Sequence, residues 1–397
     1  MKPNYVYFWI FGLLNNVLYV VILSAAFDIA GPSLPKTTIL LADILPCFII
    51  KIISPFISTS DSKNSFLNYK NRILALIISS ISGMILVSRA KVNLTVAIIG
   101  ICMASASSGF GETTFLQLTA AYGNTALQGW SSGTGMAGLF GSGFYLLLTS
   151  ILNFSVNFSL ILFSILPLGF LLYFKLPTTK TSSYTLLEEE NMEEIEISDS
   201  VPTTFSKNTI INTLKKLQTL FIPYMLPLTT VYLFEYLINQ AVSPTLLFPI
   251  DPDQKHLFFK KIQRYVYYIQ CIISVRCVYC RSTSHLIRLR NLYLISTLQF
   301  INLNIAISQS WFFIFKSPFW ILIFMFYQGF MGGASYVNTF LNIMDDITNK
   351  RDQEFALGAT SIADALGILI AALIGLKLEP TLCNHQVNTG RNWCTLE

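Results

Sequence analysis

Charge is scarce in this chain. Only 12% of its 397 residues are Asp, Glu, Lys or Arg, whereas 53% are hydrophobic, and the mean hydropathy is +0.57. Soluble globular proteins carry about 25% charged residues. The composition therefore excludes an ordinary soluble domain and indicates a chain that crosses a lipid bilayer several times.

Residues that build most catalytic and metal sites are also few. The sequence has three His, all in predicted loops, and it shows no metal-binding His cluster, nucleophile elbow, Walker loop or paired-carboxylate site. The glycine-rich run 131–143, SSGTGMAGLFGSG, lacks the ending of a phosphate loop and follows no strand, so it favours close helix packing. We expect no enzyme activity, no metal and no cofactor.

The net charge of +5 is spread among loops without a basic block, so nucleic acid is not an expected partner. The seven cysteines are scattered. Cys277 and Cys280 form a lone pair without the second pair of a zinc site. Cys383 and Cys394 lie in the C-terminal tail, where an oxidising lumen would permit a disulfide.

Long apolar runs dominate the chain instead. About eleven stretches approach the length of a spanning helix, which predicts an all-α polytopic membrane protein. The stretch at 262–280 is the weakest because Arg264, Gln270 and Arg276 lie in or beside it; without it the C-terminus changes side. The first run is too long for a signal peptide and is read as a retained helix. The stretches are 5–29, 37–57, 72–88, 92–121, 132–152, 154–175, 221–243, 262–280, 291–312, 318–344 and 355–378.

One substantial hydrophilic segment divides these runs. Residues 1–175 form a predicted six-helix half, 221–378 a five-helix half, and 379–397 a lumenal tail. Residues 176–220 form a cytosolic, acidic loop for which we expect disorder. Two halves joined by such a loop are typical of transporters.

Lys and Arg are more frequent in the loops that fall in the cytosol when the N-terminus is placed there. The same orientation puts three sequons, at Asn93, Asn153 and Asn157, in lumenal loops as glycosylation candidates. Tyr184 and Leu187 frame a Tyr-x-x-apolar pattern of the form that endosomal sorting adaptors recognise. Its place in the cytosolic loop makes such adaptors candidate partners.

Ionisable residues also occur inside the apolar runs, where they are expensive unless they face a bundle interior or a water-filled cavity. Glu112, Glu235 and Asp364 are candidates for proton coupling or for recognition of substrate charge. Gly109 and Gly111 lie just before Glu112, and we expect the helix to break there. The alternative for each acid is a structural contact between helices.

Other polar residues in these runs extend the candidate set. Asn338 and Asn342 are four apart and share one helix face. Asp43 and Lys51 are eight apart, about 12 Å along one helix, so they cannot pair with each other. Each is expected to meet a partner on another helix or, as the alternative, to extend to the headgroups. The remaining candidates for solute or proton contacts are Asn15, Asn16, Asn239, Gln240 and Arg281.

Several blocks together resemble one family of membrane proteins. The strongest are YQGFMGGASYVNTFLNI at 327–343 and EFALGATSIADALGI at 354–368. Others span the chain in order: 8–29, 40–55, 107–122, 130–141 and 231–240. These are similar to the battenin family, the lysosomal and vacuolar membrane proteins of Batten disease. The chain departs from the family at Ala241, where a glycine is expected, and before Arg281, where residues 275–280 match poorly.

The resemblance implies a two-half bundle like the major-facilitator and equilibrative nucleoside transporter folds, in a vacuolar membrane. It also implies a role in lumenal pH homeostasis and in transport of a basic amino acid such as arginine, or of a glycerophosphodiester. The expected partners are the lipid bilayer, a small polar solute and protons. The alternative is a non-transporting adaptor that regulates trafficking and proton-pump activity through the acidic loop.

Overall fold

The computed structural model describes residues 3–25, 36–58, 68–90, 93–177, 207–246, 248, 288–391 and 394. Within these ranges every regular element is a helix, which confirms the predicted all-α class. Eight of the described helices are long and apolar enough to cross a membrane. Helices also cover each predicted stretch except 262–280, which lies outside the described residues together with most of 176–220.

The N-terminal half is a bundle in which several helices begin at a polar cap. Asn93 accepts hydrogen bonds from the backbone N–H groups of Thr95 and Val96, and Ser155 accepts one from Phe158. The helices of this half are α1 (Pro3–Ser24), α3 (Lys36–Ser58), α4 (Tyr69–Val87), α5 (Leu94–Tyr122), α6 (Asn124–Leu146) with a π-helical turn (Leu147–Ile151), and α7 (Val156–Phe163) with a 3-10 helix (Leu166–Lys175).

The C-terminal half begins with a nearly continuous helical path from 207 to 245. Its last helix ends at Asn388, whereas the sequence predicted an end at 378. The more polar residues 379–388 continue the same helix. The helices are α9 (Lys207–Leu220), α10 (Leu226–Tyr236), α12 (Leu292–Phe312), α13 (Pro318–Asp346), α14 (Lys350–Thr360) and α15 (Ile362–Asn388); π-helical turns occupy Phe221–Met225 and Leu237–Val242, and a 3-10 turn Ser243–Thr245.

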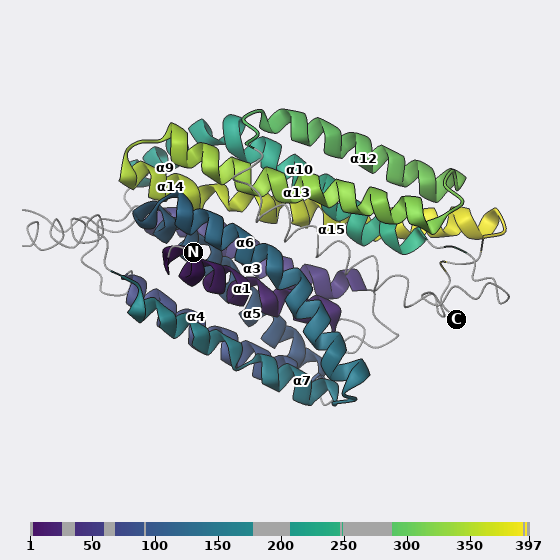
Figure 1. The fold of residues 1–397 in the computed structure, drawn as a ribbon, viewed down its shortest axis with the longest axis horizontal. Coiled ribbons are helices and arrows are strands. Elements are labelled where there is room, and N and C mark those ends of the chain that lie inside the picture. Colours follow the sequence, from purple (N-terminus) through teal and green to yellow (C-terminus); the bar gives the residue numbers. More distant parts are fainter. Residues whose placement is uncertain are drawn as a thin grey trace, which may run out of the picture.

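The two halves lie side by side, with the purple-to-blue helices on one side and the green-to-yellow helices on the other (Figure 1). We call the end that holds α9 and α14, at the left of Figure 1, the α14 end. The opposite end holds the last turns of α15. At the α14 end one apolar cluster contains residues of both halves, among them Phe115, Leu118, Phe340 and Leu357.

The opposite end is built differently. There Val17, Met84 and Ile101 belong to a cluster of the N-terminal half, while Leu246 and Leu382 belong to a cluster of the C-terminal half. The contacts between halves run mainly through α14 against α5 and α3, and through α15 against α3. The halves therefore share a core at the α14 end and keep separate cores at the other.

Glycines set the closest approach within the N-terminal half. A Cβ added to Gly133 would lie 1.9 Å from the carbonyl oxygen of Trp9, and one added to Gly12 would lie 2.3 Å from that of Trp130. Only glycine allows α1 and α6 to pack with their backbones in contact. The packing role predicted for the glycine run is confirmed at Gly133, whereas Gly143 has no neighbour within 4 Å of an added Cβ.

The expected break at Gly109 and Gly111 is wrong. Helix α5 runs without interruption from Leu94 to Tyr122. A Cβ at Gly109 would lie 2.8 Å from the carbonyl oxygen of Cys47, and one at Gly111 would lie 2.0 Å from the Asn15 side-chain oxygen. These glycines admit the neighbouring helices α3 and α1 rather than end their own.

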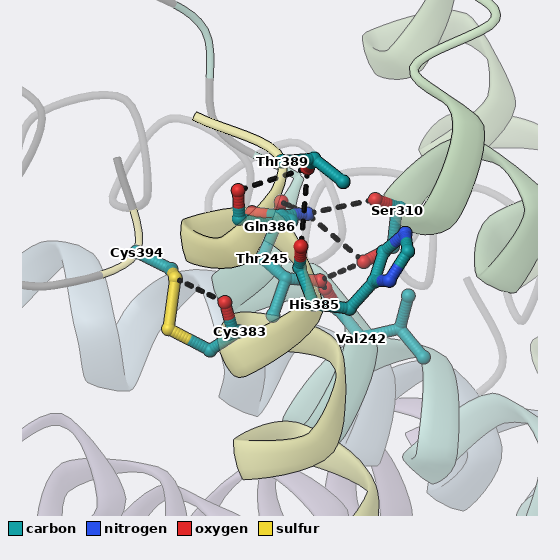
Figure 2. Close-up of a disulfide and its surroundings, with 8 residues drawn as sticks. All are labelled: Val242, Thr245, Ser310, Cys383, His385, Gln386, Thr389 and Cys394. Atoms are coloured by element: carbon teal, nitrogen blue, oxygen red, sulfur yellow. Dashed lines mark hydrogen bonds between the residues drawn. A yellow bond between two sulfur atoms is a disulfide. The ribbon is translucent and has the colours of Figure 1, made fainter. Parts of the chain in front are cut away.

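A disulfide joins Cys383 to Cys394 at the end of α15 (Figure 2). Beside it, the Gln386 side chain donates hydrogen bonds to the carbonyl oxygens of Thr245 and Ser310, both at 2.9 Å. The His385 ring stacks on Trp311 with centroids 3.7 Å apart. The tail is therefore fastened to α12 and to the turn after α10, and we call this end of the molecule the disulfide end.

Candidate functional site

Lys51 of α3 lies at the boundary between the halves and is 1% exposed. Its Nζ is 2.8 Å from Oε2 of Glu112 on α5, and 3.0 and 3.1 Å from the two carboxylate oxygens of Asp364 on α15. One buried ammonium group thus bridges a carboxylate of its own half and a carboxylate of the other half.

Two aromatic side chains extend this arrangement across the boundary. The Tyr336 hydroxyl of α13 donates a hydrogen bond of 2.8 Å to Glu112 Oε1. The Trp130 Nε1 of α6 donates one of 3.2 Å to the Tyr336 oxygen. We call Lys51, Glu112, Asp364, Tyr336 and Trp130 the ion cluster.

Local structure places each charged member. Asp364 lies in the first turn of α15, where the helix dipole favours a negative charge. Glu112 comes just after Gly109 and Gly111, the glycines that let α3 and α1 approach α5, so Lys51 of α3 can reach it. The sequence placed both carboxylates among the candidates, but it gave no sign that Lys51 was their common partner.

The ion cluster has unequal charges. With all three side chains ionised, two carboxylates face one ammonium group, and Glu112 and Asp364 are only 7% and 6% exposed. Removing such ions from water costs several kcal/mol each unless pairing offsets it. The cluster can therefore take up a proton or another cation, and it can release Lys51 from one carboxylate when it does.

Further contacts close the α14 end beyond the cluster. The Tyr69 hydroxyl of α4 donates a hydrogen bond to Glu354 of α14, and the Lys350 Nζ donates one of 3.3 Å to the Ala120 carbonyl oxygen of α5. Arg72, which the sequence reading did not single out, donates a 2.9 Å bond to Gln117. On this side the halves are joined by polar bonds as well as by the shared core.

Glu235 takes a different position from the other two acids. It lies against α13, where a Cβ added to Gly332 would be 1.9 Å from its Oε2. Near it, Asn239 accepts a 2.8 Å hydrogen bond from Gln328, which accepts one of 2.9 Å from Gln299. Asn302 donates to Gln299 at 3.1 Å. We call these four amide side chains the amide chain, and it lies wholly within the C-terminal half.

The sequence reading found Asn239 but missed Gln299, Asn302 and Gln328. Gln299 and Asn302 are three apart on α12 and both are buried, so their spacing within an apolar run was the available signal. Trp130 and Tyr336 were missed as well. Both lie in sequence blocks that carried the family resemblance.

Asn338 and Asn342 serve the backbone of the segment before α12. Asn338 accepts a 2.9 Å hydrogen bond from the backbone N–H of Leu289 and donates one to Ala334. Asn342 donates one of 3.3 Å to the carbonyl oxygen of Arg290. Their shared face, predicted from the four-residue spacing, holds this segment against α13.

The remaining candidates are spread over both halves. Asn15 donates a 3.1 Å hydrogen bond to the Ser108 carbonyl oxygen of α5, and Asn16 is half-buried in α1. Gln240 is half-buried in the π-helical turn after α10. Asp43 is buried in α3 away from the ion cluster. Arg281, Tyr184 and Leu187 lie outside the described residues.

The three sequons lie where helices begin or end. Asn93 precedes α5 and caps it, Asn153 follows the turn after α6 with a φ of 55°, and Asn157 lies in the first turn of α7. Figure 1 shows α7 toward the same end as the last turns of α15. Ala97, near the start of α5, belongs to one apolar cluster with Leu160 and Phe163 of α7, so the sequon at Asn93 lies at this end as well.

Comparison with known proteins gives consistent matches along the whole chain. A family model described as "CLN3 protein" matches residues 6–385. The chain is 49% identical to "Protein BTN1" of Saccharomyces cerevisiae, over 99% of this chain and 98% of that one. It is 50% identical to "Protein BTN1" of Eremothecium gossypii, over 98% of each.

Solved structures of major-facilitator transporters share the fold. The transporter FucP in an outward conformation matches with a TM-score of 0.54 at 15% identity, over 99% of this chain and 95% of that one. The human organic anion transporter MFSD10 matches with a TM-score of 0.58 at 12% identity, over 99% and 97%. Identities this low show the fold alone; with the family match they point to a membrane protein and not to a known enzyme class.

Proposed function

The chain belongs to the CLN3, or battenin, family, and on this basis we propose that it is a vacuolar membrane transporter for a small polar solute, coupled to protons. The observation that carries the proposal is the ion cluster, because Lys51 binds carboxylates of both halves in a buried place. Transporters made of two halves work by moving one half against the other around a central site.

In this mechanism the contact between Lys51 and Asp364 is a gate. Opening the α14 end requires Lys51 to leave Asp364, and each ion left behind would be buried without its partner. A proton on Asp364, or a cationic group of a solute, removes most of that cost. The two carboxylates are then neutralised by Lys51 when the α14 end is closed, and by a proton or the solute when it is open. Exchange between these partners produces alternating access.

Two solute classes fit this arrangement, and both come from the family resemblance. A basic amino acid such as arginine carries the cationic group that a cluster with excess carboxylate would bind. A glycerophosphodiester would instead bind Lys51 once a carboxylate is protonated. Movement of either with protons would connect the protein to lumenal pH homeostasis.

The proposed orientation places the disulfide end in the lumen and the N-terminus in the cytosol. Disulfides persist in oxidising compartments, and the three sequons share the end that carries Cys383 and Cys394. The exposed residues between α13 and α14, including Thr348, would then face the cytosol.

Thiol labelling of intact vacuoles tests this orientation. We expect a membrane-impermeant maleimide to modify a Thr348→Cys variant without permeabilisation. Cys383 and Cys394 should react only after reduction and permeabilisation together, as read by mass spectrometry of the labelled peptides. Labelling of reduced Cys383 in sealed vacuoles would reverse the orientation.

Uptake into proteoliposomes tests the transport function. Arginine and a glycerophosphodiester would be supplied in parallel, with and without a proton gradient, to wild-type protein and to Asp364→Asn. We expect gradient-dependent uptake of one solute, lowered about tenfold or more by Asp364→Asn, since 1.36 kcal/mol already corresponds to a factor of ten in rate.

The matched control is Asp352→Asn. It makes the same chemical change at a carboxylate whose side chain is 46% exposed and whose ion pair with Lys216 lies at the surface. Such exposed pairs contribute little, so uptake by this variant should equal that of the wild type. Uptake of neither solute by folded protein would favour the regulatory adaptor instead.

A further inference from the structure

Asp43 is a buried carboxylate without a partner among the residues that the structure describes. It is 1% exposed, and neither of its side-chain oxygens makes a hydrogen bond to any of them. Within the described part of the chain, no cation lies at ion-pair distance from it. Buried carboxylates in proteins are normally paired and hydrogen-bonded, so two unsatisfied oxygens on one such group call for a functional explanation.

Its position relative to the ion cluster is fixed by α3. Asp43 precedes Lys51 by eight residues, which is about 12 Å along a helix. It lies on the side of the ion cluster that faces the disulfide end, because the C-terminal part of α3 reaches toward the α14 end. The halves have separate cores on that side, whereas the shared core and polar contacts close the other.

Among the described residues, three titratable groups face this carboxylate. They are Tyr19 from α1, Cys47 from α3 itself and Cys102 from α5. The Tyr19 hydroxyl is also buried, and it makes no well-formed hydrogen bond to the described residues. It lies beside Tyr236 of α10. Asp43 and Tyr19 therefore adjoin the C-terminal half at a second point, separate from the ion cluster.

We propose that Asp43 is a proton-loading site, reached from the disulfide end and distinct from the ion cluster. A proton converts the most costly group of this region into a neutral acid that can donate a hydrogen bond. Its coupling role rests on the transport function proposed above, but its protonation does not.

The surroundings favour a proton over a metal ion. No group of three or more His, Cys, Asp or Glu side chains able to hold a metal occurs among the described residues. Hard cations need six or more oxygen ligands, and Asp43 has two thiols and a phenol nearby. A proton needs only the carboxylate.

Thermal stability as a function of pH tests the protonation without any solute. An ionised Asp43 is penalised only in the folded protein, so folding favours the proton-bound form. Wild-type stability should therefore fall as the pH rises above about 4, the ordinary pKa of an unfolded aspartate. Asp43→Asn should remove this part of the pH dependence, while Asp43→Glu and the exposed control Asp352→Asn should keep it. An unchanged pH profile in Asp43→Asn would overturn the proposal.

Proteoliposomes test the coupling role. The quantity to measure is the ratio of gradient-driven accumulation to solute exchange without a gradient, for arginine and for a glycerophosphodiester. We expect Asp43→Asn to lower this ratio about tenfold and Asp352→Asn to leave it unchanged. A wild-type ratio in Asp43→Asn would refute coupling at this site. If wild-type protein moves neither solute, the transport proposal fails, and the stability measurement still decides whether Asp43 binds a proton.

Discussion

Replacing Lys51 with methionine is expected to abolish solute uptake and to lower the free energy of unfolding by about 3–5 kcal/mol. The variant keeps nearly the volume of the side chain but leaves Glu112 and Asp364 buried together without their shared cation. The two carboxylates lose their ion pairs with Lys51, and their like charges then repel each other at close range in a buried site, which destabilises the folded protein further. Thermal unfolding in detergent and uptake into proteoliposomes would measure the two effects.

A triple variant separates charge from packing in this prediction. Combining Lys51→Met with Glu112→Gln and Asp364→Asn removes all three charges with nearly the same volumes. Because neutral or apolar replacements of a buried ion pair are often tolerated, folding should recover. Uptake should remain absent, since no group is left to exchange partners. A single Lys51→Met variant as stable as the wild type would show that the ion cluster does not form.

The second large effect is expected at a glycine far from the charges. Gly133→Ala would place a methyl group 1.9 Å from the Trp9 carbonyl oxygen and 2.8 Å from its carbonyl carbon. Both atoms are backbone, so no side chain can rotate away and α1 must move from α6. We expect the free energy of unfolding to fall by about 3 kcal/mol or more, which is the upper end of the cost of overpacking a core. The yield of monodisperse protein and its thermal stability would report it.

Gly143→Ala is the matched control for this effect. Gly143 belongs to the same helix and the same glycine-rich run, but an added Cβ there meets nothing within 4 Å. Alanine in a helix interior is favoured over glycine by about 0.5–1 kcal/mol. The control should therefore be as stable as the wild type or slightly more. Equal losses in both variants would contradict the contact between α1 and α6.

Local composition was sufficient for the class of fold. The low charge and the apolar runs required a membrane-spanning helical bundle, because a backbone in lipid must satisfy its own hydrogen bonds. The hydrophilic segment after 175 indicated the two halves, and the glycine run indicated close packing. Cys383 and Cys394, eleven residues apart in the tail, were recognised as a possible pair and form the disulfide.

The same reasoning failed at Gly109 and Gly111 for a physical reason. Glycine both weakens a helix and allows another helix to approach it, and the sequence does not say which effect applies. The answer depends on Cys47 and Asn15, which belong to other helices and fill the space beside α5.

Sequence by itself determined that the chain is a two-half helical membrane protein with a few costly polar residues in its apolar runs. It treated Glu112, Glu235 and Asp364 alike, because each is an acid at helical depth. Only the tertiary structure decided that Lys51 joins Glu112 to Asp364, which is 313 positions away from Lys51, and that Glu235 packs against α13. It also decided that Asp43 lies buried without a partner in the described part of the chain. The price of burying a charge is a local property of the residue, whereas the group that offsets it is chosen by the way distant helices pack.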